Sequence, residues 1–268
     1  MTKLATPPAP RVYGSVNWIG VLTLYKREVK RFWKVGMQTV LAPVVTTLLY
    51  MLVFVVAIGN GRQMLPGVDF AHFVGPGLIM MAILNNAFAN SSSSILQAKM
   101  MGLTPDFLTP PISSVELSSA FAAGAMTRGI FVGAVTAAAV WFFTRYEIVH
   151  LWAVLYFGFG AAMMLGLMGI FTGLWSEKFD HLAAVTNFLI MPMTFLSGTF
   201  YLVDALPEPF QTISHYNPFF YLIDSFRYGF LGQADGSLAI GVVLVAVLNV
   251  ILAVAGWALF HTGYRLKS

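Results

Sequence analysis

The residue types that most often do chemistry are scattered along this sequence rather than gathered. It has five histidines and no cysteine, and the histidines are scattered near the ends of apolar stretches and form no HExxH motif. Without cysteine there are no disulfides, thiolate metal sites or cysteine nucleophiles. The four serines Ser91–Ser94 have no histidine or lysine base nearby, so we expect them to pack helices together. The sequence therefore predicts neither an enzyme nor a metal site.

The sequence also contains no motif for binding or hydrolysing a nucleotide. No phosphate-binding GxxxxGK(S/T) loop occurs, so this chain is expected to carry no ATP site and no cofactor of its own. No Asp or Glu lies deep in an apolar stretch, whereas carriers driven by protons or sodium normally need ionisable groups inside the membrane. If the protein does work, we expect its driving force to come from a separate subunit.

Composition indicates a membrane protein. Of 268 residues, 58% are hydrophobic and only 10% are charged, whereas soluble domains are usually about 25% charged. A water-soluble enzyme is excluded, because so few charges cannot cover a globule of this size. Six continuous apolar stretches are long enough to cross about 30 Å of hydrocarbon as helices. They are Gly36–Gly59, His72–Leu96, Glu116–Phe143, His150–Trp175, Leu182–Val203 and Leu238–Phe260.

These stretches predict an all-α membrane protein with six transmembrane helices. A disordered cytoplasmic tail over residues 1–14 is expected to precede a single membrane domain over residues 15–268. Within that domain, Ser15–Lys34 has a helical period, with apolar residues on one face and five basic residues on the rest. It predicts an amphipathic helix at the membrane surface. An ordinary anchor with no other duty is the alternative.

Lysines and arginines set the expected orientation. With both termini in the cytoplasm, the cytoplasmic flanks hold eleven of these residues and the outer flanks three, as the positive-inside rule requires. One outer connection, Asp204–Ser237, is long and aromatic, and its apolar part, Phe219–Gly232, is too short to span. We predict a pair of short helices that dip into the outer leaflet and return. The alternative is an interfacial loop rich in anchoring aromatics.

Polar side chains recur at helical spacing within three of the spans and could line a path or hold helices together. They are Thr46 and Tyr50 in the first span, Asn86, Asn90 and Ser93 in the second, and Asn187, Met191 and Thr194 in the fifth. Arg128 is an intramembrane charge in the third span, at a cost of about 2.5–3.5 kcal/mol near mid-bilayer. It is expected to pair with an oxygen, to attract an anionic headgroup, or to extend toward the cytoplasm.

Three segments together resemble a known family. The first is the basic helix that leads through Trp33–Val35 into the first span. The second is Phe73–Met81, which contains Pro-Gly-Leu and is followed by Asn85–Asn90. The third is Asn217–Phe230, with the pattern Asn-Pro-x-x-Tyr…Asp-x-x-Arg-Tyr-Gly. From about residue 16 onward the chain resembles the permease (transmembrane) subunits of ABC-2 type transporters, most closely the YadH-like branch of bacterial inner-membrane exporters.

The resemblance implies a homodimer in membrane lipid that binds two cytoplasmic ABC ATPase subunits, with ATP and Mg on those partners and no nucleic acid. It implies an exporter of a hydrophobic or amphipathic substrate, such as a drug, a lipid or a lipid-linked glycan, working by alternating access. A self-sufficient secondary transporter or channel is the alternative.

The resemblance also implies roles for three groups of residues. Contacts to the ATPase would come from the amino-terminal helix (Arg27, Glu28, Arg31) and from the loop Ala98–Val115 (Thr104, Pro105, Asp106, Phe107, Leu108, Pro110). The outer hairpin, with Asn217, Pro218, Tyr221, Asp224 and Arg227, would shape the exit of the path. Relatives often carry acidic residues before a Leu-Leu-x-x-Pro element in this loop, whereas Asp106 is the single acid here.

Overall fold

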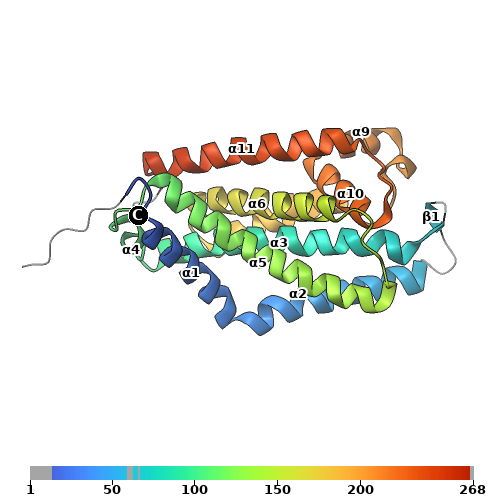
Figure 1. Cartoon of the computed structure of the whole chain (residues 1–268), viewed down its shortest axis with the longest axis horizontal. Helices are drawn as coiled ribbons and strands as arrows, with labels where there is room; N and C mark the ends of the chain where they lie inside the picture. Colours follow the sequence, from blue (N-terminus) through green and yellow to red (C-terminus); the bar gives the residue numbers. More distant parts are fainter. Residues whose placement is uncertain (1–13, 59–62, 66, 266–268) are drawn as a thin grey trace, which may run out of the picture.

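The chain forms an elongated bundle of helices, shown from the side in Figure 1. The computed structural model describes residues 14–58, 63–65 and 67–265, so most of the predicted tail lies outside the described residues. Within the described residues, five helices are long and apolar enough to cross a membrane. They are α2 (Gly36–Met51) with its π-helical extension η1 (Leu52–Ile58), α3 (Phe70–Met100), α5 (Ser114–Thr144), α6 (Leu151–Trp175) and α11 (Leu238–Thr262).

Helix α3 is the centre of the bundle, and α2, α5, α6 and α10 (Pro218–Leu231) all pack against it. Most of its residues are buried, including the segment from Phe73 to Leu84. Its contact with α6 is close: a Cβ at Gly169 would lie 2.6 Å from the carbonyl oxygen of Phe88. Ser91 donates a hydrogen bond to the Gly166 carbonyl at 2.6 Å. The prediction that this serine packs helices together is thereby confirmed.

The fifth predicted span is shorter than the sequence pattern suggests. Residues Leu182–Val203 were expected to be helical, but the helix runs only through α7 (Phe179–Val185), the π-helix η2 (Thr186–Ile190) and α8 (Met191–Phe195). The chain then turns at Gly198, whose φ of +71° suits glycine. Pro192 has no N–H for the carbonyl four residues earlier, and the π-helix lies just before it. The six-span count stays a prediction.

The two ends of the bundle are built differently (Figure 1). One end, called the α4 end here, holds the start of α1 (Trp18–Lys34), the short helix α4 (Pro105–Leu108) and the end of α11. The opposite end, the α9 end, holds the hairpin β1 (Gln63–Leu65) and β2 (Val68–Asp69), the turn η3 (Val203–Ala205) and α9 (Glu208–Tyr216). The predicted pair of short helices in Asp204–Ser237 is thus present as α9 and α10.

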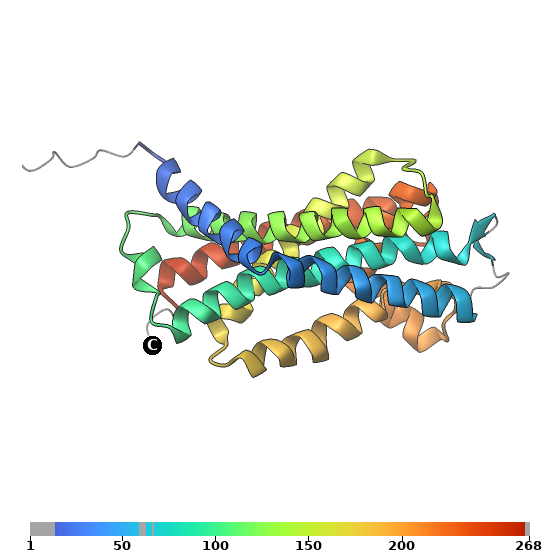
Figure 2. The same ribbon diagram turned by 90° about the horizontal axis from the view of Figure 1, so that it is seen from below.

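In Figure 2, α2 (blue) lies over α3 (teal), and the helix formed by α7, η2 and α8, called the 179–195 helix here, runs along the lower edge of the bundle (gold). Both α2 and the 179–195 helix carry large exposed apolar side chains, among them Leu49 on α2 and Phe188 on η2, at 55% and 84% exposure. Side chains of this kind are stable only against lipid or another protein. This face of the bundle is where the predicted polar stripes meet.

Candidate functional site

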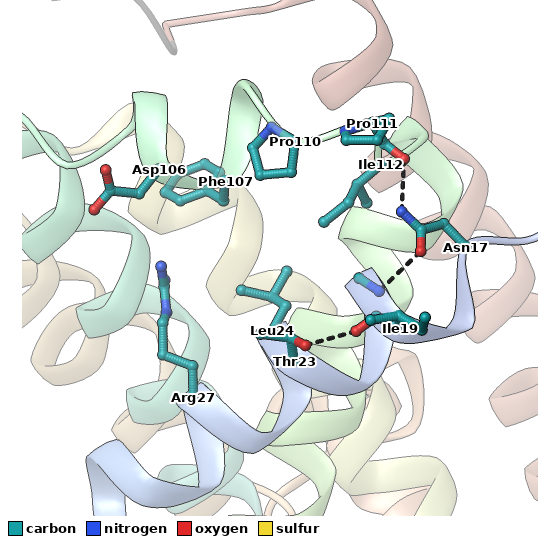
Figure 3. Close-up of a pocket in the computed structure, with 11 residues that line it drawn as sticks. Asn17, Ile19, Thr23, Leu24, Arg27, Asp106, Phe107, Pro110, Pro111 and Ile112 are labelled. Atoms are coloured by element: carbon teal, nitrogen blue, oxygen red, sulfur yellow. Dashed lines mark hydrogen bonds between the residues drawn. The ribbon is translucent and has the colours of Figure 1, made fainter. Parts of the chain in front are cut away.

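At the α4 end, α1 and the loop that carries α4 lie against each other and line a pocket of about 330 Å³ (Figure 3). Arg27 on α1 faces Phe107 on α4, with its Cζ 5.5 Å from the ring centroid. Phe107 is buried and packs edge-on against Phe121 of α5. Its neighbour Asp106 is exposed. The two elements that were predicted to couple to an ATPase therefore form one surface.

The start of α1 is fastened to the start of α5 by Glu116. One carboxylate oxygen accepts from the backbone N–H of Asn17 at 2.6 Å and the other from that of Ser113 at 2.7 Å. The Asn17 side chain donates to the Pro111 carbonyl at 2.9 Å and accepts from Gly20 N–H at 3.0 Å, which caps α1 (Figure 3). Glu116 thus completes the capping box of α5 and, through its bond to the backbone of Asn17, also fixes the start of α1.

Further along, α1 joins α3 through buried and half-buried polar residues that we call the α1–α3 lock: Glu28, Arg31, Asn90, Ser93 and Ser94. Glu28 has no exposed surface, and its carboxylate accepts from the Ser94 hydroxyl at 2.8 Å. Arg31 lies 3.5 Å from the same carboxylate. It donates to the backbone carbonyl of Asn90 at 2.6 Å, to the Asn90 side chain at 3.1 Å and to the Ser93 hydroxyl at 3.2 Å. Burial lowers the pKa of Arg31, and Glu28 opposes that shift.

The lock depends on close approach of α1 to α5. A Cβ at Gly124 of α5 would lie 2.6 Å from the Cβ of Glu28, so glycine is required there. The geometry gives Glu28 and Arg31 partners inside this chain, and only Arg27 of the three predicted contact residues on α1 points at the pocket. In the loop, Thr104 and Phe107 are buried, whereas Pro105, Asp106, Leu108 and Pro110 are exposed. The exposed four remain available to a partner.

A groove of about 360 Å³ opens between α2, α3 and the 179–195 helix. Four predicted path residues line it, and they come from three separate spans: Thr46, Tyr50, Asn86 and Met191. The structure adds polar residues that the stripes did not include, namely Thr47, Asn85 and Thr186. Every lining side chain is uncharged and most are apolar, as is usual for sites that bind small molecules.

The other predicted path residues lie elsewhere. Asn90 and Ser93 belong to the α1–α3 lock, at the edge of α3 that faces α1. Thr194 is fully buried and donates to the Met191 carbonyl at 2.8 Å, within its own helix. Asn187 is exposed and does not line the groove. The groove therefore gathers part of each stripe.

Arg128 on α5 is half-buried, and one of its N–H groups donates to Asn86 Oδ1 at 3.3 Å. Asn86 also donates to the Ala82 carbonyl at 3.0 Å. Within the described residues, Arg128 makes no ion pair with a carboxylate. Of the three expectations for this charge, pairing with an oxygen is the one the structure contains.

At the α9 end, Arg227 of α10 ties three segments together. It donates to the carbonyls of Phe73 at 3.1 Å and Gly198 at 2.6 Å, and its Cζ lies 3.8 Å from the Phe73 ring centroid. Asp224 lies 3.7 Å away and accepts from the N–H groups of Asp235 and Gly236 at 3.0 and 2.9 Å. These charges are buried but almost fully hydrogen-bonded, as such groups must be.

Asn217 extends this joint to the end of α8. Its side chain donates to the Met193 carbonyl at 2.7 Å and to the Ser197 hydroxyl at 2.8 Å, and it caps α10 by accepting from Phe219 N–H at 3.0 Å. Pro218 is the first residue of α10, where its missing N–H is harmless. Tyr221 is half-buried and lies against Phe220. Most residues of the Asn-Pro…Asp-x-x-Arg pattern therefore hold α10 against the start of α3 and against the end of the 179–195 helix.

Comparison of the sequence with known proteins finds a family and several relatives. The ABC-2 type transporter family matches residues 20–231. The chain is 33% identical over 252 residues to the inner membrane transport permease YadH of Escherichia coli K12, covering 94% of this chain and 98% of that protein, and equally to YadH of Shigella flexneri. It is 24% identical over 256 residues to nodulation protein J of Rhizobium leguminosarum bv. viciae, covering 91% and 93%.

The chain belongs to the ABC-2 type transporter family, as its three motifs predict. It is a membrane permease of the type that works with an ABC ATPase.

Proposed function

We propose that this chain is the transmembrane subunit of an ATP-driven exporter in the bacterial inner membrane. Two copies would enclose a path, and two separate ATPase subunits would supply the energy. The observation that carries the proposal is the meeting of three polar stripes in one groove, on a face whose exposed apolar residues suit a second copy. The relatives named as inner membrane transport permeases support the location.

In this proposal α1 lies at the cytoplasmic surface, and the α4 end with both termini faces the cytoplasm. The short helices α9 and α10 dip into the outer leaflet and shape the exit. The 179–195 helix, which is the fifth predicted span, also crosses the membrane and brings the number of crossings to six. The ATPase contacts the surface formed by Arg27, Pro105, Asp106, Leu108 and Pro110. Because α1 is bonded to α3 through the lock, a push on α1 would move the helix that lines the groove.

The substrate would be hydrophobic or amphipathic, because the groove is lined mainly by apolar side chains. A drug, a lipid and a lipid-linked glycan each meet that description. Alternating access between two arrangements of the helices would carry it outward.

Co-purification with the cognate ATPase, followed by reconstitution into liposomes, tests the proposal. We expect a stable complex with two copies of each subunit, and transport that needs ATP hydrolysis. Asp106→Ala or Leu108→Ala should weaken coupling while membrane insertion stays intact. Transport by the purified chain alone, driven by an ion gradient, would instead establish a self-sufficient carrier.

A further inference from the structure

We infer that aromatic side chains close the outer end of the groove, and that it opens when α2 and η1 move away from a fixed turn at residues 196–201. The inference rests on the proposed function, since it concerns how a substrate would leave the groove. Helix α2 runs toward the α9 end, and Tyr50 is the last of its residues in the groove lining. What lies beyond Tyr50 therefore decides whether the groove continues outward.

Four rings, which we call the aromatic closure, lie at this point: Tyr50, Phe54, Phe195 and Phe200. The rings of Phe54 and Phe200 are stacked, with centroids 4.4 Å apart. Tyr50 contacts these two rings at centroid distances of 6.2 and 5.9 Å, and Phe195 stacks on Phe200 at 5.3 Å. Phe200 is buried. The groove is therefore closed toward the α9 end by rings that meet at Phe200.

The turn that carries Phe200 is fixed to the bundle by hydrogen bonds. The Gly198 carbonyl accepts from Arg227 at 2.6 Å, and the Leu196 carbonyl accepts from the Ser214 hydroxyl at 2.8 Å. Gly198 is buried, so moving the turn would leave its carbonyl without a donor, which is unfavourable. This turn forms one wall of the closure, and we call it the fixed wall.

The glycine of the Pro-Gly-Leu motif seats the fixed wall on α3. A Cβ at Gly77 would lie 3.0 Å from the carbonyl oxygen of Thr199, so only a glycine lets the turn come this close without a shift. The Thr199 hydroxyl in turn donates to the Thr194 carbonyl at 2.8 Å, which ties the turn to α8. The motif thus helps to place Phe200 against the rings of the opposite wall.

That opposite wall, which we call the moving wall, consists of α2 and η1 and carries Tyr50 and Phe54. Within the described residues, no side-chain hydrogen bond or ion pair joins α2 or η1 to another helix. Ring contacts can separate without leaving a buried polar group unpaired. In addition, η1 is a π-helix, a form that is frequent at functional sites. We therefore expect the moving wall, and not the turn, to shift when the groove opens.

Cross-linking of engineered cysteines tests the inference, because the chain has no cysteine of its own. Phe54→Cys with Phe200→Cys connects the two walls. The matched control, Phe195→Cys with Phe200→Cys, replaces another stacked pair but connects positions on the fixed side. A short bis-methanethiosulfonate reagent should link both pairs in the complex reconstituted with its ATPase. Trapping that complex with ATP and vanadate should lower linking of the first pair about tenfold, as for a closed state that becomes the minor one, and leave the control unchanged.

A second measurement leaves all four rings in place. Thr46→Cys puts one thiol in the groove lining, on the inner side of Tyr50. A membrane-impermeant maleimide added to the outer side should label it slowly in the resting complex and about tenfold faster in the trapped one.

Three results would overturn the inference. Unchanged linking of the Phe54 and Phe200 positions in the trapped complex would mean that the closure does not open. An equal loss of linking in the control pair would mean that the turn itself moves. Labelling of Thr46→Cys at the same rate in both states would mean that the rings do not close the groove. If the complex still hydrolyses ATP in these cases, the proposed function stands and only the closure fails, whereas a chain that binds no ATPase would refute both.

Discussion

Replacing Glu28 with leucine tests whether α1 is built into the bundle or merely rests on it. The change removes the acceptor for the Ser94 hydroxyl and the carboxylate that pairs with Arg31 in the described residues, and it puts an apolar side chain of similar size in their place. Both remaining groups would then be buried or half-buried without their partner. Because Glu28 itself has no exposed surface, water cannot easily replace what is lost.

The magnitude follows from the three contacts of the carboxylate. A hydrogen bond to a charged group is worth about 1.5–3 kcal/mol, which applies to the Ser94 contact. The pair with Arg31 adds roughly 1 kcal/mol, because the arginine side chain is 26% exposed and partly screened. Arg27 is 40% exposed and contributes little. Glu28→Leu should therefore cost about 2–4 kcal/mol, and Glu28→Gln, which can still accept from Ser94, about half of that.

Thermal unfolding of the purified protein in detergent measures the effect. At about 2–4 °C per kcal/mol for a chain of this size, Glu28→Leu should lower the apparent Tm by roughly 5–10 °C, and Glu28→Gln by less. The matched control is Glu177→Gln, whose side chain is 68% exposed and lies 3.8 Å from Arg265. It should shift Tm by about 1 °C or less. If Glu28→Leu unfolded at the same temperature as this control, the contacts of Glu28 in the lock would not contribute to the stability of the protein.

Three further predictions concern other joints of the bundle. Gly124→Val should prevent α1 from docking and lower Tm, whereas Gly36→Ala, where nothing lies within 4 Å of the new methyl group, should not; equal melting of the two would refute the close approach. Arg227→Leu should leave the carbonyls of two segments without a donor and cost about 2–4 kcal/mol, with Arg145→Gln on the surface as a near-neutral control in the same unfolding assay. Lys99→Met should expose the loop after α6 to limited proteolysis, because its ammonium group holds two carbonyls at the end of α6, one of them at 2.8 Å; an unchanged cleavage pattern would contradict this.

Some features of the site could be read from residue order alone, because they depend on local spacing. A helix within Ser15–Lys34, which in the structure begins at Trp18, and the pair of short helices after Asp204 follow from apolar period and from proline positions. The close contacts at Gly129 and Gly169 follow from small residues four apart in long apolar helices. The family motifs also act locally, since they consist of consecutive residues.

Which face of each helix meets which partner was decided by the tertiary structure. Asn85 and Asn86 are neighbours in sequence, and spacing favoured Asn86 for the path. The packing of α3 places both side chains on the lining of the groove and also ties Asn86 to Arg128 of α5. Likewise, the family resemblance implied that Glu28 contacts the ATPase, yet its side chain lies against Ser94 and Gly124 within this chain.

The amino-acid sequence by itself determined the positions of five long apolar helices, the lack of a local nucleotide motif and the family. These properties depend on hydropathy and on short motifs of nearby residues, which do not change with the tertiary contacts of the chain. The tertiary structure alone decided where the fifth predicted span ends, which residues meet at the groove and which buried polar groups are paired. Such outcomes depend on contacts between residues up to 154 positions apart, as between Arg227 and Phe73, and no local pattern encodes them.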